Sequence, residues 1–136
     1  MPNRWLIKSE PFKYSWDDLV RDGETVWDGV RNHLAAQNLR AMSEGDPCFF
    51  YHSNEGLQIV GIAEISESGL IDPTDVEGKW PTVKVKPVKA LDHPVTLKAI
   101  KANPDLAGID LIRLSRLSVA QIRSSEWDEI MRMSGR

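Results

Sequence analysis

The sequence predicts an α+β domain in which a small, strongly curved sheet or barrel is surrounded by short helices. Several strand-like runs are interrupted by short helical segments, without the regular alternation of strand and helix that builds a parallel sheet. The length of 136 residues suits one domain, so we expect residues 1–136 to form a single unit. The hydrophobic content of 41% and the charged content of 27% are those of an ordinary globular protein.

Capping residues mark the first two helices. Ser15 is a suitable N-cap for a short helix, and Gly23 is a suitable stop. Asn32 is a suitable N-cap for a second helix, whose apolar residues recur at helical spacing before Gly45. The first 45 residues are therefore expected to form a strand over Trp5–Lys8 and helices over Trp16–Arg21 and His33–Met42.

Strand patterns dominate the middle of the chain. Ser53–Gly56 has the composition of a hairpin loop between two apolar runs, and a later run alternates valine with lysine. Gly61 within the second run indicates a bulge or a close approach by another backbone. The expected strands are Cys48–His52, Leu57–Ile65 and Thr82–Val88.

The C-terminal third is predicted from shorter signals. Ser118 and Gln121 have the spacing of a capping box, which predicts a short helix, and Ser125 is a suitable cap for a final helix. A short helix over Pro94–Ala102 and a last strand over Leu111–Leu117 are expected before them.

The charge of the chain is unevenly distributed. The net charge of −3 argues against a protein that coats DNA without specificity. Residues 79–101 nevertheless contain six lysines against Asp92 alone, so this stretch could follow a phosphate backbone or could be a solvated face. No apolar run approaches the ~20 residues of a membrane span, no signal peptide is recognisable, and a single cysteine cannot form an internal disulfide. A cytoplasmic location, or a nuclear one in a eukaryote, is expected.

The familiar patterns of catalytic and metal sites are missing from the sequence. Cys48 and His52 would lie on one face of a strand but about 13 Å apart, at ~3.3 Å per residue, which is too far for a catalytic dyad. The histidines have no ligand spacing, and there is no phosphate-binding or dinucleotide fingerprint. We therefore expect a protein that is not an enzyme and that has no metal and no cofactor; Cys48 is expected to be a small buried residue.

The segment Val26–Asn32 has a composition that a buried surface would not select. It combines a large aromatic ring, a carboxylate, a glycine, a guanidinium and an amide. Such groups can stack on a flat polar molecule and hydrogen-bond to its edges, which is how proteins recognise nucleobases. We therefore predict that Trp27 faces a ligand, whereas Trp5, Trp16 and Trp127 lie among apolar neighbours and are expected in the core; the pattern does not decide for Trp80.

Several ordered blocks of the sequence resemble the EVE domain family, from Trp5 to about Ile130. The blocks are Trp5–Pro11, Trp27–Asn32, Gly45–Asp46, Phe49–Asn54, Val60–Glu64, Asp72–Thr74 and Arg116–Val119. The resemblance implies a PUA-like curved β-barrel of about five to six strands with flanking short helices. It also implies kinship with YTH domains, which read methylated adenine in RNA, and an association with modified cytosines in DNA.

The resemblance implies a module that binds a modified nucleobase, most directly 5-methyl- or 5-hydroxymethylcytosine, with DNA favoured over RNA. An RNA-binding module and a protein that acts on a nucleotide-like small ligand stay open as alternatives. A monomer is expected. The residues expected to contact phosphates are Lys84, Lys86, Lys89 and Arg116. The residues expected to line the base pocket are Lys8, Ser9, Glu10, Trp27, Asp28, Gly29, Val30, Arg31, Asn32, Tyr51, His52, Ser53, Asn54, Leu117 and Ser118.

Overall fold

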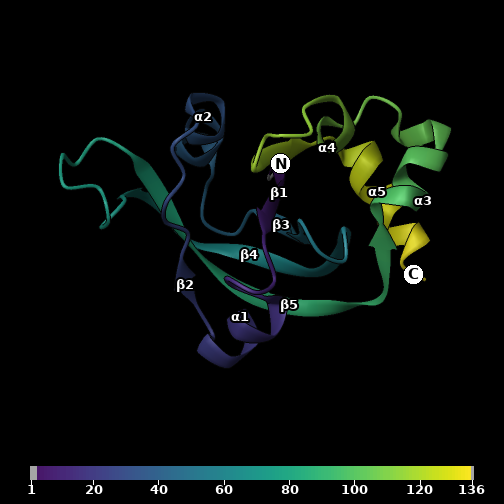
Figure 1. Cartoon of the computed structure of the whole chain (residues 1–136), viewed down its shortest axis with the longest axis horizontal. Coiled ribbons are helices and arrows are strands. Elements are labelled where there is room, and N and C mark those ends of the chain that lie inside the picture. Colours follow the sequence, from purple (N-terminus) through teal and green to yellow (C-terminus); the bar gives the residue numbers. More distant parts are fainter. Residues whose placement is uncertain (1–2, 136) are drawn as a thin grey trace.

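A computed structural model describes residues 3–135, which form a curved sheet of six strands with short helices around it (Figure 1). The strand order is β2-β5-β4-β3-β1-β6. The predicted α+β class is confirmed. In chain order the elements are β1 (Arg4–Ser9), α1 (Trp16–Asp22), β2 (Thr25–Val26), α2 (His33–Ala41), β3 (Pro47–His52), β4 (Gln58–Ile71), β5 (Pro81–Thr96), α3 (Leu97–Ala102), a 3₁₀ helix (Pro104–Leu106), α4 (Asp110–Arg113), β6 (Val119–Ile122) and α5 (Ser124–Met133).

Strand β1 occupies a central place in the sheet and runs parallel to β3. Its last two residues, Lys8 and Ser9, pair with Tyr51 and His52 of β3. On its other side β1 pairs with β6 in the antiparallel sense. Because β1 and β3 are parallel, their carboxyl ends lie side by side, and the amide of Ser53 donates to the carbonyl of Ser9 (2.9 Å).

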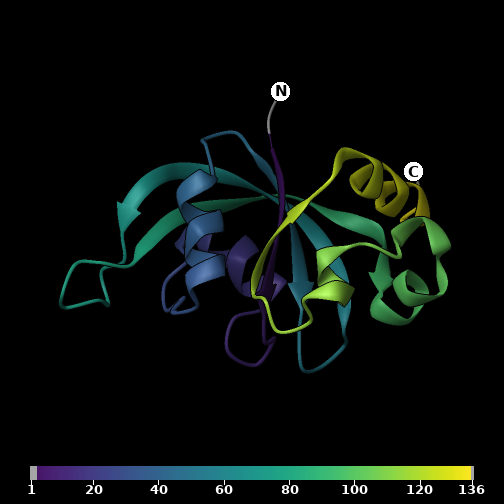
Figure 2. The same cartoon turned by 90° about the horizontal axis from the view of Figure 1, so that it is seen from above.

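Strands β4 and β5 form a long antiparallel ribbon that crosses the molecule. Their pairing contains four shifts of register, and such irregularities bend and twist a ribbon. Figure 2 shows α2 near one end of this ribbon and the helices α3 and α5 near the other end. The ribbon therefore supplies the curvature that the sequence predicted for the sheet.

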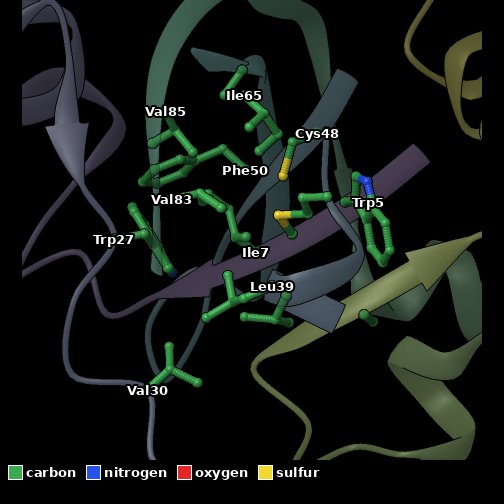
Figure 3. Packing of buried hydrophobic residues seen from close by; sticks show 14 of the residues in the cluster. Trp5, Ile7, Trp27, Val30, Leu39, Cys48, Phe50, Ile65, Val83 and Val85 are labelled. Carbon is green, nitrogen blue, oxygen red and sulfur yellow. The ribbon is translucent and has the colours of Figure 1, made fainter. Parts of the chain in front are cut away.

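The alternation of side chains along β1 and β3 divides the core into two clusters. Trp5, Ile7 and Phe50 belong to a cluster that also packs against α1 and α2, and Figure 3 shows its interior. The intervening residues Leu6 and Phe49 belong to a second cluster under α3 and α5. Both faces of these strands are covered, which explains their nearly continuous apolar sequence. The predicted burial of Trp5, Trp16, Trp127 and Cys48 is confirmed.

Two predictions for the C-terminal third are wrong. Residues 111–117 do not form a strand, because α4 begins at Asp110, where the Asp110 carboxylate pairs with Arg113 one turn later (2.6 Å). The helix predicted after Ser118 is instead the strand β6, which pairs with β1 and buries Val119 and Ile122. The hydrogen bonds to β1 and the burial of these side chains outweigh a local capping signal.

Other differences concern the ends of elements. β4 extends to Ile71 and β5 to Thr96, so the helix predicted from Pro94 begins only at Leu97, with Thr96 as its N-cap. The strand β2 was not predicted, and α5 begins at Ser124. Within residues 3–135 no helix is long and apolar enough to cross a membrane.

The buried carboxylate of Asp46 joins the start of β3 to β1. One oxygen, Oδ2, accepts from the indole Nε1 of Trp5 (2.9 Å) and from the amide of Ser43 (2.9 Å). The change Asp46→Ala leaves both donors without this partner, and we expect it to lower the free energy of unfolding by about 2–3 kcal/mol. Urea denaturation followed by tryptophan fluorescence measures this loss. The exposed Asp92, changed to Ala, is the control, and equal effects at both positions would contradict the assignment.

Candidate functional site

A cleft with a volume of about 1160 Å³ lies at the carboxyl ends of β1 and β3. Its walls come mainly from four segments around these ends, over residues 10–14, 25–32, 53–57 and 111–118; the second begins with β2 and the fourth begins within α4. The structure brings most of the predicted pocket residues together here: Lys8, Ser9, Glu10, Trp27, Asp28, Gly29, Val30, Arg31, Asn32, Tyr51, Ser53, Asn54 and Ser118 line the cleft, as does Arg116 of the predicted phosphate contacts.

Two predicted pocket residues lie outside the cleft lining. His52 accepts a hydrogen bond at Nε2 from the amide of Trp16 (3.0 Å) and lies edge-on to Phe50. Burial lowers the pKa of His52, which favours the neutral ring that can accept this bond. Leu117 is buried in the core cluster that contains Val30. Both side chains support the walls of the cleft from behind.

Trp27 belongs to the core and to the cleft at the same time. Its ring lies edge-on to Phe50 (5.6 Å between centroids) and to Tyr14 (6.3 Å), and 9% of the residue surface is exposed. Its amide donates to the carbonyl of Val83 (2.9 Å), and its carbonyl accepts from the hydroxyl of Thr82. Figure 3 shows Trp27 at the margin of the cluster. Four neighbours thus fix the ring where the cleft begins.

The indole N–H of Trp27 is available to a ligand. Trp5 donates its indole N–H to Asp46, but no residue between 3 and 135 accepts from the corresponding nitrogen of Trp27. Over the same range, every side-chain nitrogen or oxygen that is fully buried has a hydrogen-bond partner. The indole N–H of Trp27 therefore retains contact with solvent at the edge of the cleft.

The carboxylate of Asp72 holds the loop that follows Trp27. It accepts from the amide of Gly29 (2.7 Å) and from Nη1 of Arg31 (2.9 Å) at Oδ2, and from Thr74 at Oδ1. Burial alone raises the pKa of Asp72, but the hydrogen bonds from Thr74, Arg31 and Gly29 outweigh it and hold the pKa at about 2. Gly29 has a φ of 81°, a value that favours glycine. This anchor was missed from the sequence, although Asp72 was part of a resembling block.

Arg31 is engaged by the protein itself. Besides Asp72, its guanidinium contacts the carbonyl of Val30 (3.0 Å) and lies 5.6 Å from the ring centroid of Trp80. Trp80 also stacks on His33, with 5.1 Å between the centroids. Trp80, which the sequence left undecided, is thus a half-buried stacking platform beside the cleft. The contacts of Arg31 with Asp72 and Trp80 thus hold the connection between β4 and β5 (residues 72–80) against the loop that follows Trp27.

Asp28 and Asn32 leave polar groups free at the cleft. Asn32 accepts from the amide of Ala35 (2.9 Å) as the N-cap of α2, which uses its oxygen and leaves its amide nitrogen without a partner among residues 3–135. Asp28 is exposed, and its carboxylate has no partner over the same range. The cleft therefore presents one acceptor group and two N–H donor groups around Val30, the donors being the Asn32 amide and the Trp27 indole.

Lys8 and Ser9 turn to opposite sides at the end of β1. The ammonium of Lys8 donates to the carbonyl of Ser115 (2.8 Å) and lies 5.9 Å from the ring centroid of Tyr51. Burial lowers the pKa of Lys8. The hydroxyl of Ser9 donates to the carbonyl of Tyr14 (2.5 Å), next to Trp27. The end of β1 therefore divides the cleft into two parts.

The predicted phosphate contacts on β5 are not brought to the cleft. Lys84 pairs with Glu67 (3.4 Å) and Lys86 with Glu64 (3.3 Å), across the β4–β5 ribbon. Lys89 is exposed on the same strand, and none of these lysines lines the cleft. Their contact with phosphates stays a prediction. Cleft residues that the sequence did not single out are Lys13, Tyr14, Thr25, Val26, Leu57, Leu97, Leu111 and Ser115.

Across residues 3–135, no three His, Cys, Asp or Glu side chains are grouped closely enough to hold a metal ion.

The curved sheet, the flanking helices and the cleft of aromatic and polar groups define a small PUA-like barrel domain. The EVE domain matches residues 3–133, and the chain belongs to this family. The resemblance seen in the sequence is thus confirmed over nearly the whole chain.

Known proteins are similar to this chain in sequence or in structure over nearly all of its residues. Thymocyte nuclear protein 1 of Rattus norvegicus is 32% identical over 96% of this chain and 73% of the relative. The structure of Rpa0253 from Rhodopseudomonas palustris is 49% identical, with a TM-score of 0.94 over 98% of this chain and 93% of that chain. A structure of the human THYN1 protein in complex with 5-methylcytosine containing DNA is 29% identical, with a TM-score of 0.91 over 98% of both chains.

The likeness to YTH domains is one of fold. The YTH domain of Zygosaccharomyces rouxii MRB1, solved in complex with N6-methyladenosine RNA, has a TM-score of 0.58 and 19% identity. It covers 99% of this chain and 85% of that chain. The expected similarity of fold to YTH domains is therefore confirmed.

Proposed function

We propose that this chain is a non-catalytic module that binds a modified base, 5-methyl- or 5-hydroxymethylcytosine in DNA, in the part of the cleft next to Trp27. The observation that carries the proposal is the arrangement of free polar groups around a fixed aromatic ring: the Trp27 indole N–H, the Asp28 carboxylate and the Asn32 amide. The human THYN1 protein, solved with 5-methylcytosine containing DNA, supports the choice of ligand. Its name also supports a nuclear location in a eukaryotic cell.

The roles follow from the chemistry of cytosine. Asp28 accepts from the exocyclic amine, and the N–H groups of Asn32 and Trp27 donate to the acceptor edge of the ring. Only a small part of Trp27 is exposed, so the base contacts the free margin of the indole. Val30 lines the same part of the cleft and offers an apolar surface to the added methyl group. One buried methyl contributes about 0.8 kcal/mol, so methylated cytosine should be preferred only about fourfold over plain cytosine.

The charge of the cleft favours a moderate affinity for the sugar-phosphate backbone of a nucleic acid. Lys8 and Arg116 line it without a carboxylate partner among the described residues, whereas Lys13 is paired with Glu10 (3.0 Å). Two free cations correspond to few phosphate contacts, and the acidic net charge opposes tight general binding. We therefore expect affinity to fall with salt, but with a shallow slope.

The test is a fluorescence-anisotropy titration at low and physiological salt. One sequence is offered as DNA and RNA, single- and double-stranded, with plain, 5-methyl- and 5-hydroxymethylcytosine or with N6-methyladenine. We expect the tightest binding to DNA with a modified cytosine, and no turnover of any ligand. Tighter binding of the RNA series would replace the DNA proposal by an RNA-binding module, and turnover of a modified nucleoside would replace it by an enzyme.

The variants must separate binding from folding. Trp27→Ala would remove a core side chain, which costs about 3–5 kcal/mol, so it cannot serve alone. Trp27→Phe keeps a ring and removes the N–H, and Asn32→Ser keeps the N-cap and removes the amide. Asp28→Ala is the third single variant. Each of the three should weaken binding of the modified oligonucleotide by about tenfold, the value of one hydrogen bond to a base edge. Asp92→Ala is the control, and unchanged affinity in all three variants would refute the base-binding role.

A further inference from the structure

The cleft is larger than a single base requires. Its volume of about 1160 Å³ exceeds the roughly 300–1,000 Å³ of sites for drug-sized ligands. The groups assigned to the base gather at one end, around Trp27. Tyr51, Leu97 and Leu111 also line the cleft, but they pack with the second core cluster, whereas Trp27 and Val30 belong to the first. Together with Leu57, whose carbonyl accepts from the amide of Leu97, they form an apolar wall at the opposite end, which the base-binding role leaves without an occupant.

We propose that the apolar end is a second subsite that takes the base of the neighbouring nucleotide, so that the unit recognised by the cleft is a dinucleotide. The proposal rests on the proposed function and names its ligand more narrowly. A base offers a flat face that packs on apolar and aromatic side chains whatever its sequence. The subsite therefore adds affinity for a neighbour without reading the identity of that neighbour.

The second subsite is built on rigid elements. Tyr51 and Leu111 are buried and form its floor, from β3 and α4. Leu57 and Leu97 form its rim, and the amide of Leu97 donates to the carbonyl of Leu57 (2.8 Å), which fixes the two relative to each other. Leu57 is 43% exposed although it is a large apolar residue. An exposed leucine held at the edge of a cleft is suited to contact a ligand.

The boundary between the two subsites has the charge that a linking phosphate needs. The end of β1 separates them, since Ser9 reaches toward Tyr14 on one side and Lys8 toward Tyr51 on the other. The ammonium of Lys8 contacts a carbonyl and an aromatic ring but no carboxylate within residues 3–135. Arg116 also lines the cleft and directly follows Ser115, whose carbonyl accepts from Lys8 (2.8 Å), so the two cations lie near each other. A phosphate between two bases would meet these two cations.

The experiment compares ligands that differ by one nucleotide. The probes are 5-methyl-2′-deoxycytidine 5′-monophosphate and the dinucleotides that extend it by one deoxyadenylate on the 5′ or the 3′ side, each also prepared with plain cytosine. Titration calorimetry gives the ratio of mononucleotide to dinucleotide dissociation constants. For the wild-type chain we expect a ratio of at least about fivefold for one of the two dinucleotides, from the lower value for stacking of one base.

The variants test whether the apolar end produces this ratio. Leu57→Asn removes the apolar rim, and asparagine tolerates the positive φ of this position (41°). Leu34→Asn is a matched control, because Leu34 is equally exposed (43%) and does not line the cleft. The ratio should fall to about one in Leu57→Asn, should stay at the wild-type value in Leu34→Asn, and should be retained in the conservative variant Leu57→Met.

A wild-type ratio near one, or a ratio that survives Leu57→Asn, would overturn the second subsite. Failure of the modified-base proposal would be seen separately. Plain and methylated cytosine would then bind with equal affinity in the mononucleotide and in both dinucleotides. The ratio of mononucleotide to dinucleotide dissociation constants would still test the role of Leu57. Absence of binding by every probe overturns both proposals.

Discussion

Replacing Asp72 by asparagine should reduce stability and ligand binding together. The two carboxylate oxygens accept from the amides of Gly29 and Thr74, the hydroxyl of Thr74 and the guanidinium of Arg31. Asparagine has the same size but presents an NH₂ group in place of one carboxylate oxygen. The N–H and O–H groups that donate to that oxygen would then face another hydrogen-bond donor. Leaving a buried charged network partly unpaired costs about 2–4 kcal/mol, and we expect a loss of that size in the free energy of unfolding.

The same substitution should change the dependence of stability on pH. The pKa of Asp72 in the folded protein is about 2, below its ordinary value of 3.8. A carboxyl group whose pKa is lowered by folding contributes stability above its unfolded pKa and loses that contribution as the pH falls toward the folded pKa. The wild-type chain should therefore lose about 2 kcal/mol from this group between about pH 5 and pH 2, at 1.36 kcal/mol per pKa unit. Asp72→Asn should lack this loss.

Urea denaturation at several pH values, combined with anisotropy titration at neutral pH, measures both effects. The wild-type chain also contains Glu129, whose pKa is held at about 2 by hydrogen bonds from Arg132 and Asn103, so the difference between the two proteins isolates Asp72. Affinity for the modified oligonucleotide should fall about tenfold or more because the loop of Asp28 and Asn32 loses its anchor. A variant that is less stable but binds as well as wild type would show that Asp72 does not order this loop for binding.

Local signals in the sequence predicted the elements that local interactions control. Ser15 caps α1 and Asn32 caps α2 through hydrogen bonds within three residues, so the pattern contains the whole interaction. The short apolar runs of β1 and β3 were recognisable for the same reason. The strand β6 was mistaken for a helix because Ser118 and Gln121 mimic a capping box, whereas the competing interaction comes from β1, more than 100 residues earlier.

In the candidate site, too, the sequence predicted what is local in the chain and missed what depends on distant residues. The segment Trp27–Asn32 was recognisable because its unusual composition is continuous in sequence, and the structure places all of it along the cleft. Asp72 was not assigned because it anchors this segment from more than 40 residues away. Leu57, Leu97 and Leu111 come from separate elements and look like ordinary core residues one at a time. Only the folded chain shows that they share one wall.

Replacing Gly61 by alanine should destabilise the protein by about 3 kcal/mol, at the upper end of the range for overpacked cores. The expected bulge at Gly61 is present as irregular pairing on both sides of β4, but the close neighbour is a side chain, not another backbone. A Cβ at this position would lie 2.6 Å from Cη2 and Cζ3 of Trp16. Trp16 cannot move away, because its ring packs edge-on against Phe50 (5.6 Å) and its amide bonds to His52.

The sign of the effect makes Gly61→Ala a sharp test. At an unstrained position with free space, glycine to alanine stabilises by about 0.4–1 kcal/mol, because the unfolded chain loses conformational freedom. Gly108→Ala is the comparison, since its Cβ would meet only the far end of the Arg123 side chain (2.8 Å). That end can shift at the cost of its ion pair with Glu126 (2.8 Å), so we expect a smaller loss of stability than at Gly61. Adding Trp16→Phe to Gly61→Ala removes part of the obstructing ring, so the double variant should lose less stability than the sum of the two single variants, by about 1–3 kcal/mol. Strict additivity in chemical denaturation would mean that the indole does not limit this position, and that the glycine serves only the bend of β4.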